Sequence, residues 1–141
     1  MDRSKFGTPL TDARIGAAIE VHRELGPGLL ESAYEECLCE ELRDRGIAYR
    51  RQIELPIVYK GRRVDFAYRL DIVAEYQRLI EVKAVDQLIP VHEAQVLTYL
   101  RLSGYRVALL MDFNTPLLRQ GLRRFVLSRN SASPRLRGKS S

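Results

Sequence analysis

Apolar residues in the first third of the chain recur every three or four positions, the spacing of helices buried on one face. The spacing predicts a first helix that ends at Leu25, with Thr11 as its N-cap and Gly26-Pro27-Gly28 as the turn after it. A second predicted helix runs from about Leu30 to Arg45 and is closed by the next glycine.

The remainder of the chain alternates strand-like runs with one further helix. That helix begins at Pro90 and ends before Gly104. Runs rich in β-branched and aromatic residues predict strands over residues 47–55, 57–60, 64–74, 78–84, 105–113 and 122–127. The order of elements predicts an α/β fold in which helices flank a mixed sheet.

Two of these runs, residues 64–74 and 78–84, are separated by only three polar residues and are predicted to form a hairpin. With Tyr76 at its tip, the numbers of paired residues sum to 152, so Asp71 faces Glu81. Cross-strand partners point to the same face, with Cβ atoms roughly 5 Å apart. The register therefore predicts a close pair of carboxylates.

A lysine accompanies these acids. Lys83 lies two residues after Glu81, so strand periodicity places both on one face. Two carboxylates so close need a cation, and the arrangement predicts a divalent-ion site with an ammonium beside it, suited to phosphodiester hydrolysis. The alternatives are a solvated polar hairpin, or a one-residue register shift that separates the acids.

The second predicted helix offers a third carboxylate. On a helical wheel, Glu31 projects between Leu38 and Leu42 on the apolar face, whereas Glu36 lies on the polar side. A buried carboxylate needs a partner, and a metal ion shared with the hairpin acids would supply one. A salt bridge or exposure at the edge of the face are the alternatives.

The third predicted helix carries polar residues that could contact a phosphate. Gln95 and Tyr99 are four positions apart and share a face. His92 has a weaker claim, because a single histidine more often caps a helix or is exposed. Glycine-rich phosphate loops and nucleophile–base pairs are not suggested by the sequence.

Length and composition predict one globular domain over residues 11–127, preceded by a lead-in over 1–10 and followed by a basic, disordered tail over 128–141. The net charge of +5 is concentrated at the end of the chain, because no acidic residue follows Asp112. Such a tail either binds a polyanion or is simply solvated.

The two cysteines, Cys37 and Cys39, are two positions apart in a helical segment and are predicted to be free thiols in a reducing compartment, the cytoplasm. The sequence has no apolar run as long as a membrane span and no signal-peptide pattern. A membrane partner is therefore not expected.

Three motifs together resemble one protein family. Gly28-Leu29-Leu30-Glu31-Ser32-Ala33-Tyr34 resembles the GxxExxY signature of a small prokaryotic group in the PD-(D/E)XK nuclease superfamily. Asp71 followed by Glu81-Val82-Lys83 resembles the D…ExK core of that superfamily, although Leu70 stands where a proline is common. Gln95 to Tyr99 is similar to the QxxxY motif of its RecB-type branch.

The resemblance covers residues 11–127 and implies a restriction-endonuclease-like core with metal-dependent nuclease activity. Asp71, Glu81, the Val82 carbonyl and Glu31 are the expected ligands of Mg²⁺ or Mn²⁺. Lys83 is expected to act on the attacking water or the developing charge, with Gln95 and Tyr99 orienting the phosphate or the water.

Nucleic acid is the expected partner, with DNA favoured over RNA. One alternative is a nuclease fold that binds nucleic acid or a protein without cutting it. A second is a hydrolase of small phosphoesters. The sequence leaves the oligomeric state open, a homodimer included.

Overall fold

The computed structural model describes residues 12–75 and 77–127. In chain order the elements are α1 (Ala13–Leu25), α2 (Glu31–Asp44), β1 (Tyr49–Tyr59), β2 (Arg62–Ala74), β3 (Arg78–Lys83), α3 (Pro90–Ser103), β4 (Val107–Asp112), the 3₁₀ helix η3 (Leu118–Gly121) and β5 (Leu122–Val126). The lead-in, the basic tail and the tip residue Tyr76 lie outside this range. Within it, no helix is long and apolar enough to cross a membrane.

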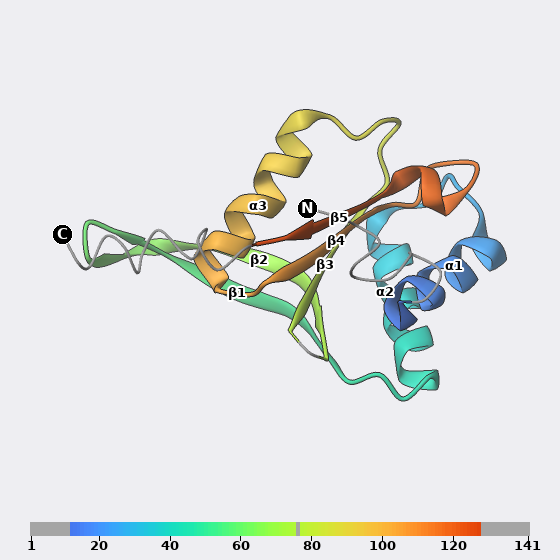
Figure 1. Cartoon of the computed structure of the whole chain (residues 1–141), viewed down its shortest axis with the longest axis horizontal. Helices are drawn as coiled ribbons and strands as arrows, with labels where there is room; N and C mark the ends of the chain where they lie inside the picture. Colours follow the sequence, from blue (N-terminus) through green and yellow to red (C-terminus); the bar gives the residue numbers. More distant parts are fainter. Residues whose placement is uncertain (1–11, 76, 128–141) are drawn as a thin grey trace.

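The five strands form one mixed sheet in the order β1-β2-β3-β4-β5. Among the described strands, only β3 and β4 pair in parallel, and α3 makes the crossover between them. α3 covers one face of the sheet, and α1 and α2 lie at the other (Figure 1). The predicted α/β fold with a mixed, helix-flanked sheet is confirmed.

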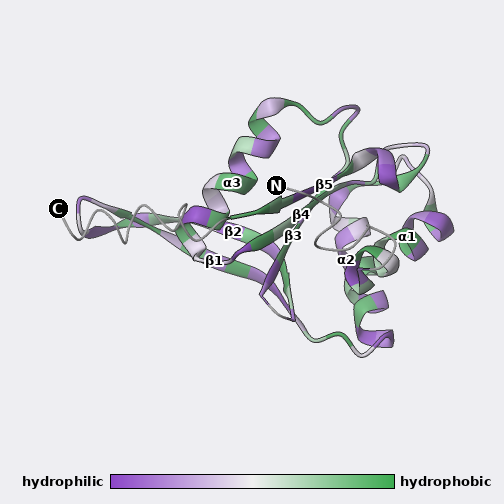
Figure 2. Cartoon of the chain, in the orientation of Figure 1, coloured by the Kyte–Doolittle hydropathy of each residue, from purple (hydrophilic) through white to green (hydrophobic). Residues whose placement is uncertain are grey.

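Each face of the sheet has its own hydrophobic core. Residues of α1 and α2 pack with Ile80 and Val82 of β3, and residues of α3 pack with Leu79 of the same strand. A strand covered on both faces is apolar along most of its length, as the centre of the sheet is in Figure 2. Glu81 interrupts this apolar strand and therefore lies inside the protein.

The first two strands are longer than predicted. The two strands predicted at residues 47–55 and 57–60 are one strand, because β1 continues through Pro56 with a register irregularity between Pro56 and Val58. Strand β2 begins at Arg62, and the two strands extend beyond the body of the protein as a hairpin (Figure 1). We call residues 55–68 the β1–β2 arm.

The predicted apolar face of α2 is confirmed at Leu38 and Leu42, which are buried, but not at its N-terminal end. Glu31 is exposed and Leu30 is 76% exposed. The buried residues are Tyr34, Glu35, Leu38, Cys39 and Leu42. Glu31 lies four positions before Glu35 on the same side of the helix, and it is exposed because it is the first residue of α2. The first helix also differs from the prediction, since the Asp12 side chain caps it by accepting a hydrogen bond from Arg14 N.

Candidate active site

The ladder between β2 and β3 has the predicted register, with Ile72 opposite Ile80, and ends at this pair. Beyond this pair, side-chain hydrogen bonds of the two acids replace the backbone hydrogen bonds between the strands. Asp71 N donates to Glu81 Oε1 at 3.1 Å, and Val82 N donates to Asp71 Oδ2 at 2.9 Å. The acids therefore face each other across a gap that their own side chains bridge.

The environment of these acids disfavours their ionised forms. Burial, together with the charge of Asp71, raises the pKa of Glu81, whose residue is only 4% exposed. Burial also raises the pKa of Asp71, partly offset by the hydrogen bond from Val82 N. The two carboxyl groups are unfavourable when both are ionised, and a bound cation would offset their negative charge.

The donor atoms suit a hard cation. Each carboxylate uses one oxygen to hold a strand amide, and among the described residues Asp71 Oδ1 and Glu81 Oε2 make no hydrogen bond. Mg²⁺ and Mn²⁺ prefer oxygen ligands of this type. No group of three His, Cys, Asp or Glu side chains within residues 12–75 and 77–127 is arranged to hold a metal ion. Glu31, Asp71 and Glu81 thus do not form a complete cluster.

The crossover helix brings polar groups to the end of β3. Lys83 Nζ donates to Gln95 Oε1 at 3.3 Å, which joins the strand to α3. Tyr99 lies one turn further along and is 5% exposed. Burial, with the charge of Glu81, raises the pKa of its hydroxyl to about 12. Gln95 and Tyr99 also line a pocket of about 290 Å³ between β2 and α3.

A family model described as the PD-(D/E)XK nuclease superfamily matches residues 8–125, which is most of the chain. The chain belongs to this superfamily. No curated protein and no solved structure gives a significant match. The RecB-type and GxxExxY resemblances remain predictions.

In this PD-(D/E)XK domain, the loop that precedes α2 places Glu31 beside the end of β3. Gly28 has φ of +105°, which favours glycine. The Tyr34 hydroxyl donates to Gly26 O at 2.6 Å and accepts from Leu29 N at 3.0 Å. Glu31 then reaches the end of β3, where Ala84 N donates to its Oε2 at 3.3 Å. Glu31 is next to the site, although the argument from its burial was wrong.

Replacing Tyr34 by phenylalanine is expected to destabilise the fold by about 1–3 kcal/mol, because it leaves the Gly26 carbonyl and the Leu29 amide without their partner. Tyr49→Phe is the matched control, since its hydroxyl accepts only an exposed hydrogen bond from Arg43, and it should cost less than about 0.5 kcal/mol. Urea denaturation measures both. Equal losses would show that the Tyr34 hydroxyl does not hold the loop.

Glu35 is the residue of this site region that the sequence did not reveal. It is 6% exposed and pairs with Arg51, whose Nε lies 2.8 Å from Glu35 Oε2. Its charge adds to the effect of burial on the pKa of both Asp71 and Glu81. The available signal was its spacing, since Glu35 lies three and seven positions before Leu38 and Leu42 on α2.

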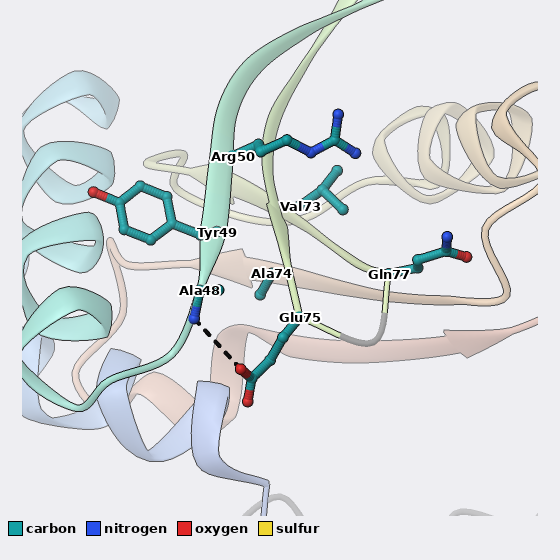
Figure 3. Close-up of a pocket in the computed structure, with 7 residues that line it drawn as sticks. All are labelled: Ala48, Tyr49, Arg50, Val73, Ala74, Glu75 and Gln77. Carbon is teal, nitrogen blue, oxygen red and sulfur yellow. Dashed lines mark hydrogen bonds between the residues drawn. The ribbon is translucent and has the colours of Figure 1, made fainter.

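Two other features of the PD-(D/E)XK domain lie apart from the acids. His92 Nδ1 accepts a hydrogen bond from Ile89 N at 3.1 Å and so caps α3. A pocket of about 330 Å³ lies beside the start of β1 and the end of β2, where Glu75 accepts from Ala48 N (Figure 3). None of the predicted site residues lines that pocket.

Proposed function

We propose that the protein is a nuclease that depends on Mg²⁺ or Mn²⁺ and hydrolyses phosphodiester bonds, with DNA as its substrate. The observation that carries the proposal is the gap at the end of the β2–β3 ladder, where the buried Glu81 and the half-buried Asp71, both of raised pKa, lie next to a lysine. Membership of the PD-(D/E)XK nuclease superfamily supports the same chemistry.

Asp71 and Glu81 would hold the ion, together with the Val82 carbonyl. The exposed carboxylate of Glu31, which lies at Ala84, would complete the site directly or through water. When bound, such an ion activates a water molecule and offsets the charge that develops on the phosphate. It would also replace the proton that the buried acids otherwise retain.

Lys83 would place its ammonium against an oxygen of the scissile phosphate. It is two residues past Glu81 on the same strand. One of its three N–H groups donates a hydrogen bond to the amide oxygen of Gln95. The other two N–H groups can donate hydrogen bonds to the phosphate as negative charge develops on it. Gln95 is then a positioning residue that fixes the direction of the lysine.

Tyr99 would act as a neutral hydrogen-bond donor. A hydroxyl whose pKa is raised to about 12 keeps its proton at every physiological pH. It can therefore donate to a phosphate oxygen without adding negative charge to the site. Tyr99 lines a pocket together with Gln95, so a phosphate bound there would meet both side chains.

The proposed role of Glu31 is tested by two matched substitutions on α2. Glu31→Gln is expected to weaken Mn²⁺ binding about tenfold, the effect of losing a ligand or the group that orients one. Glu36→Gln should leave the affinity unchanged, because Glu36 pairs with Arg51 on the surface. Isothermal calorimetry measures both affinities. Wild-type affinity in Glu31→Gln would remove this residue from the site.

The proposed activity is tested by incubating the purified protein with labelled single- and double-stranded DNA and RNA. Cleavage is expected with Mn²⁺ or Mg²⁺ and not with EDTA. Binding without cleavage in every divalent-ion condition would contradict the nuclease proposal and favour a non-cleaving binding module. Hydrolysis confined to nucleotides or small phosphoesters would favour the second alternative.

The cysteines bear on where this activity would take place. Both are free thiols, and burial raises the pKa of Cys39 to about 11. A thiol that is not ionised is a poor nucleophile, so Cys39 is a packing residue. Free thiols support the proposed cytoplasmic location.

A further inference from the structure

The β1–β2 arm exposes aromatic side chains where it leaves the body of the protein. A two-stranded hairpin without a covering layer has little core of its own to fill. Phe66 is nevertheless 59% exposed and Tyr68 is 39% exposed. Exposed aromatic side chains at close spacing are typical of a binding surface.

Two of these rings form a row that leads to the candidate active site. The ring centroids of Phe66 and Tyr68 are 5.3 Å apart, and those of Tyr68 and Tyr99 are 5.4 Å apart. Tyr68 and Tyr99 also line the pocket of about 290 Å³ that contains Gln95. We call Phe66, Tyr68 and Tyr99 the aromatic row. It joins an exposed strand of the arm to a residue near the buried acids.

The charge of the arm fits a polyanion. Between Leu55 and Tyr68 the arm contains three basic residues and one acid, Asp65, a net charge of +2. The basic residues are exposed, and none of them forms an ion pair with another described residue; they are Lys60, Arg62 and Arg63. Residues 1–112 as a whole have a net charge of −2, so the arm is a positive projection on a slightly negative body.

We propose that the arm binds a single-stranded segment of nucleic acid, whose unpaired bases stack on Phe66 and Tyr68 while its backbone follows the basic residues. This inference rests on the proposed nuclease function and names its substrate class. Aromatic side chains next to positive charge bind single strands, because the bases of a duplex are already stacked on one another. The row directs such a strand toward Tyr99.

A second copy of the chain is the competing occupant of the same surface. Its exposed apolar residues, which include Val58, could pack against a partner. The cluster of like charges at the tip argues against a contact that brings two tips together, since Lys60, Arg62 and Arg63 would then meet their own copies.

Binding in EDTA tests the proposal without requiring cleavage. Fluorescence anisotropy with the full chain should show tighter binding of a labelled single-stranded DNA than of the same sequence as a duplex. Phe66→Leu and Tyr68→Leu retain apolar bulk but remove the ring, and each should weaken single-strand binding roughly tenfold. Duplex binding should change less than about twofold.

Tyr59→Ala is the matched control, because this equally exposed ring lies under Lys60, whose Nζ is 5.4 Å from its centroid, and is outside the row. Its single-strand affinity should fall less than about threefold. Circular dichroism and melting establish that every variant is folded. Equal affinity for single strands and duplexes, or wild-type affinity in Phe66→Leu, would overturn the proposal.

Two further results have distinct meanings. A change from dimer to monomer in Phe66→Leu by sedimentation, with DNA binding unaltered, would assign the surface to a second copy and overturn the proposal. Preferred single-strand binding in EDTA that depends on the row, in a protein that cleaves nothing, would support the arm's role while contradicting the nuclease activity. Cleavage by a protein that binds single strands and duplexes equally would support the nuclease function and overturn the proposed role of the arm.

Discussion

Substitution of Lys83 by alanine is expected to slow phosphodiester cleavage by at least ~100-fold, the loss typical for a positioned donor to a developing negative charge. Asp71→Asn and Glu81→Gln should each reduce the rate by a similar or larger factor, since each removes a carboxylate from the proposed ion site. Single-turnover kinetics at saturating substrate and fixed Mn²⁺ measure these losses separately from affinity.

Glu40→Gln is the matched control for charge removal. Glu40 lies on the exterior of α2, where its carboxylate contacts Arg43 at 3.1 Å in an exposed pair. Such pairs contribute little, so the variant should cleave at the wild-type rate. A wild-type rate in Lys83→Ala would show that the ammonium has no role in the reaction.

The free energy of unfolding should fall as the pH rises and should increase when a divalent ion is added. The pKa of Asp71 is raised from 3.8 to about 6 and that of Glu81 from 4.5 to about 8. Over this interval the folded state holds protons that the unfolded state has released. In EDTA, the contribution of this pair is greatest below about pH 4 and is lost as the pH rises toward about 8.

A divalent ion that binds only the folded state reverses this loss. At a hundredfold excess over its dissociation constant it stabilises the fold by about 2.7 kcal/mol. The effect should grow with pH, because the ion competes with the protons on its ligands. Asp71→Asn should melt at or above the wild-type temperature in EDTA at pH 8, yet gain little from Mn²⁺. Melting curves that millimolar Mn²⁺ and Mg²⁺ leave unmoved would argue strongly against the ion site.

The site could be predicted from sequence where local rules decide the structure. The three-residue break between two strands sets the register that brings Asp71 opposite Glu81, and alternation adds Lys83. The contact of Lys83 with Gln95 depends on where the crossover helix packs, which no local pattern gives. Whether Asp71, Glu81 and Lys83 act in catalysis is still a prediction.

The errors arose where several packing solutions fit one pattern. A helical wheel puts Glu31 and Glu35 on the same side of α2, but it does not show where along the helix the core ends. The buried carboxylate is Glu35, which Arg51 stabilises, and Glu31 is exposed at the first residue of the helix. Asp112 was also overlooked. It is 1% exposed, and its Oδ1 accepts from Asn114 N and Val85 N at 3.0 Å. The contact with Val85 joins segments that are 27 positions apart, which no local pattern reveals.

The hydrogen bonds that close the β2–β3 gap have an evolutionary consequence. Asp71 and Glu81 each hold a backbone amide of the opposite strand through one side-chain oxygen, so selection for a stable sheet would retain an acid or its amide at both positions after catalysis had been lost. Among the described residues the Lys83 side chain donates one hydrogen bond, to Gln95, and it holds no backbone amide of another strand. In related proteins that have lost cleavage, Lys83 should therefore be replaced first. The presence of a lysine at this position then distinguishes an active protein from an inactive one better than either carboxylate does.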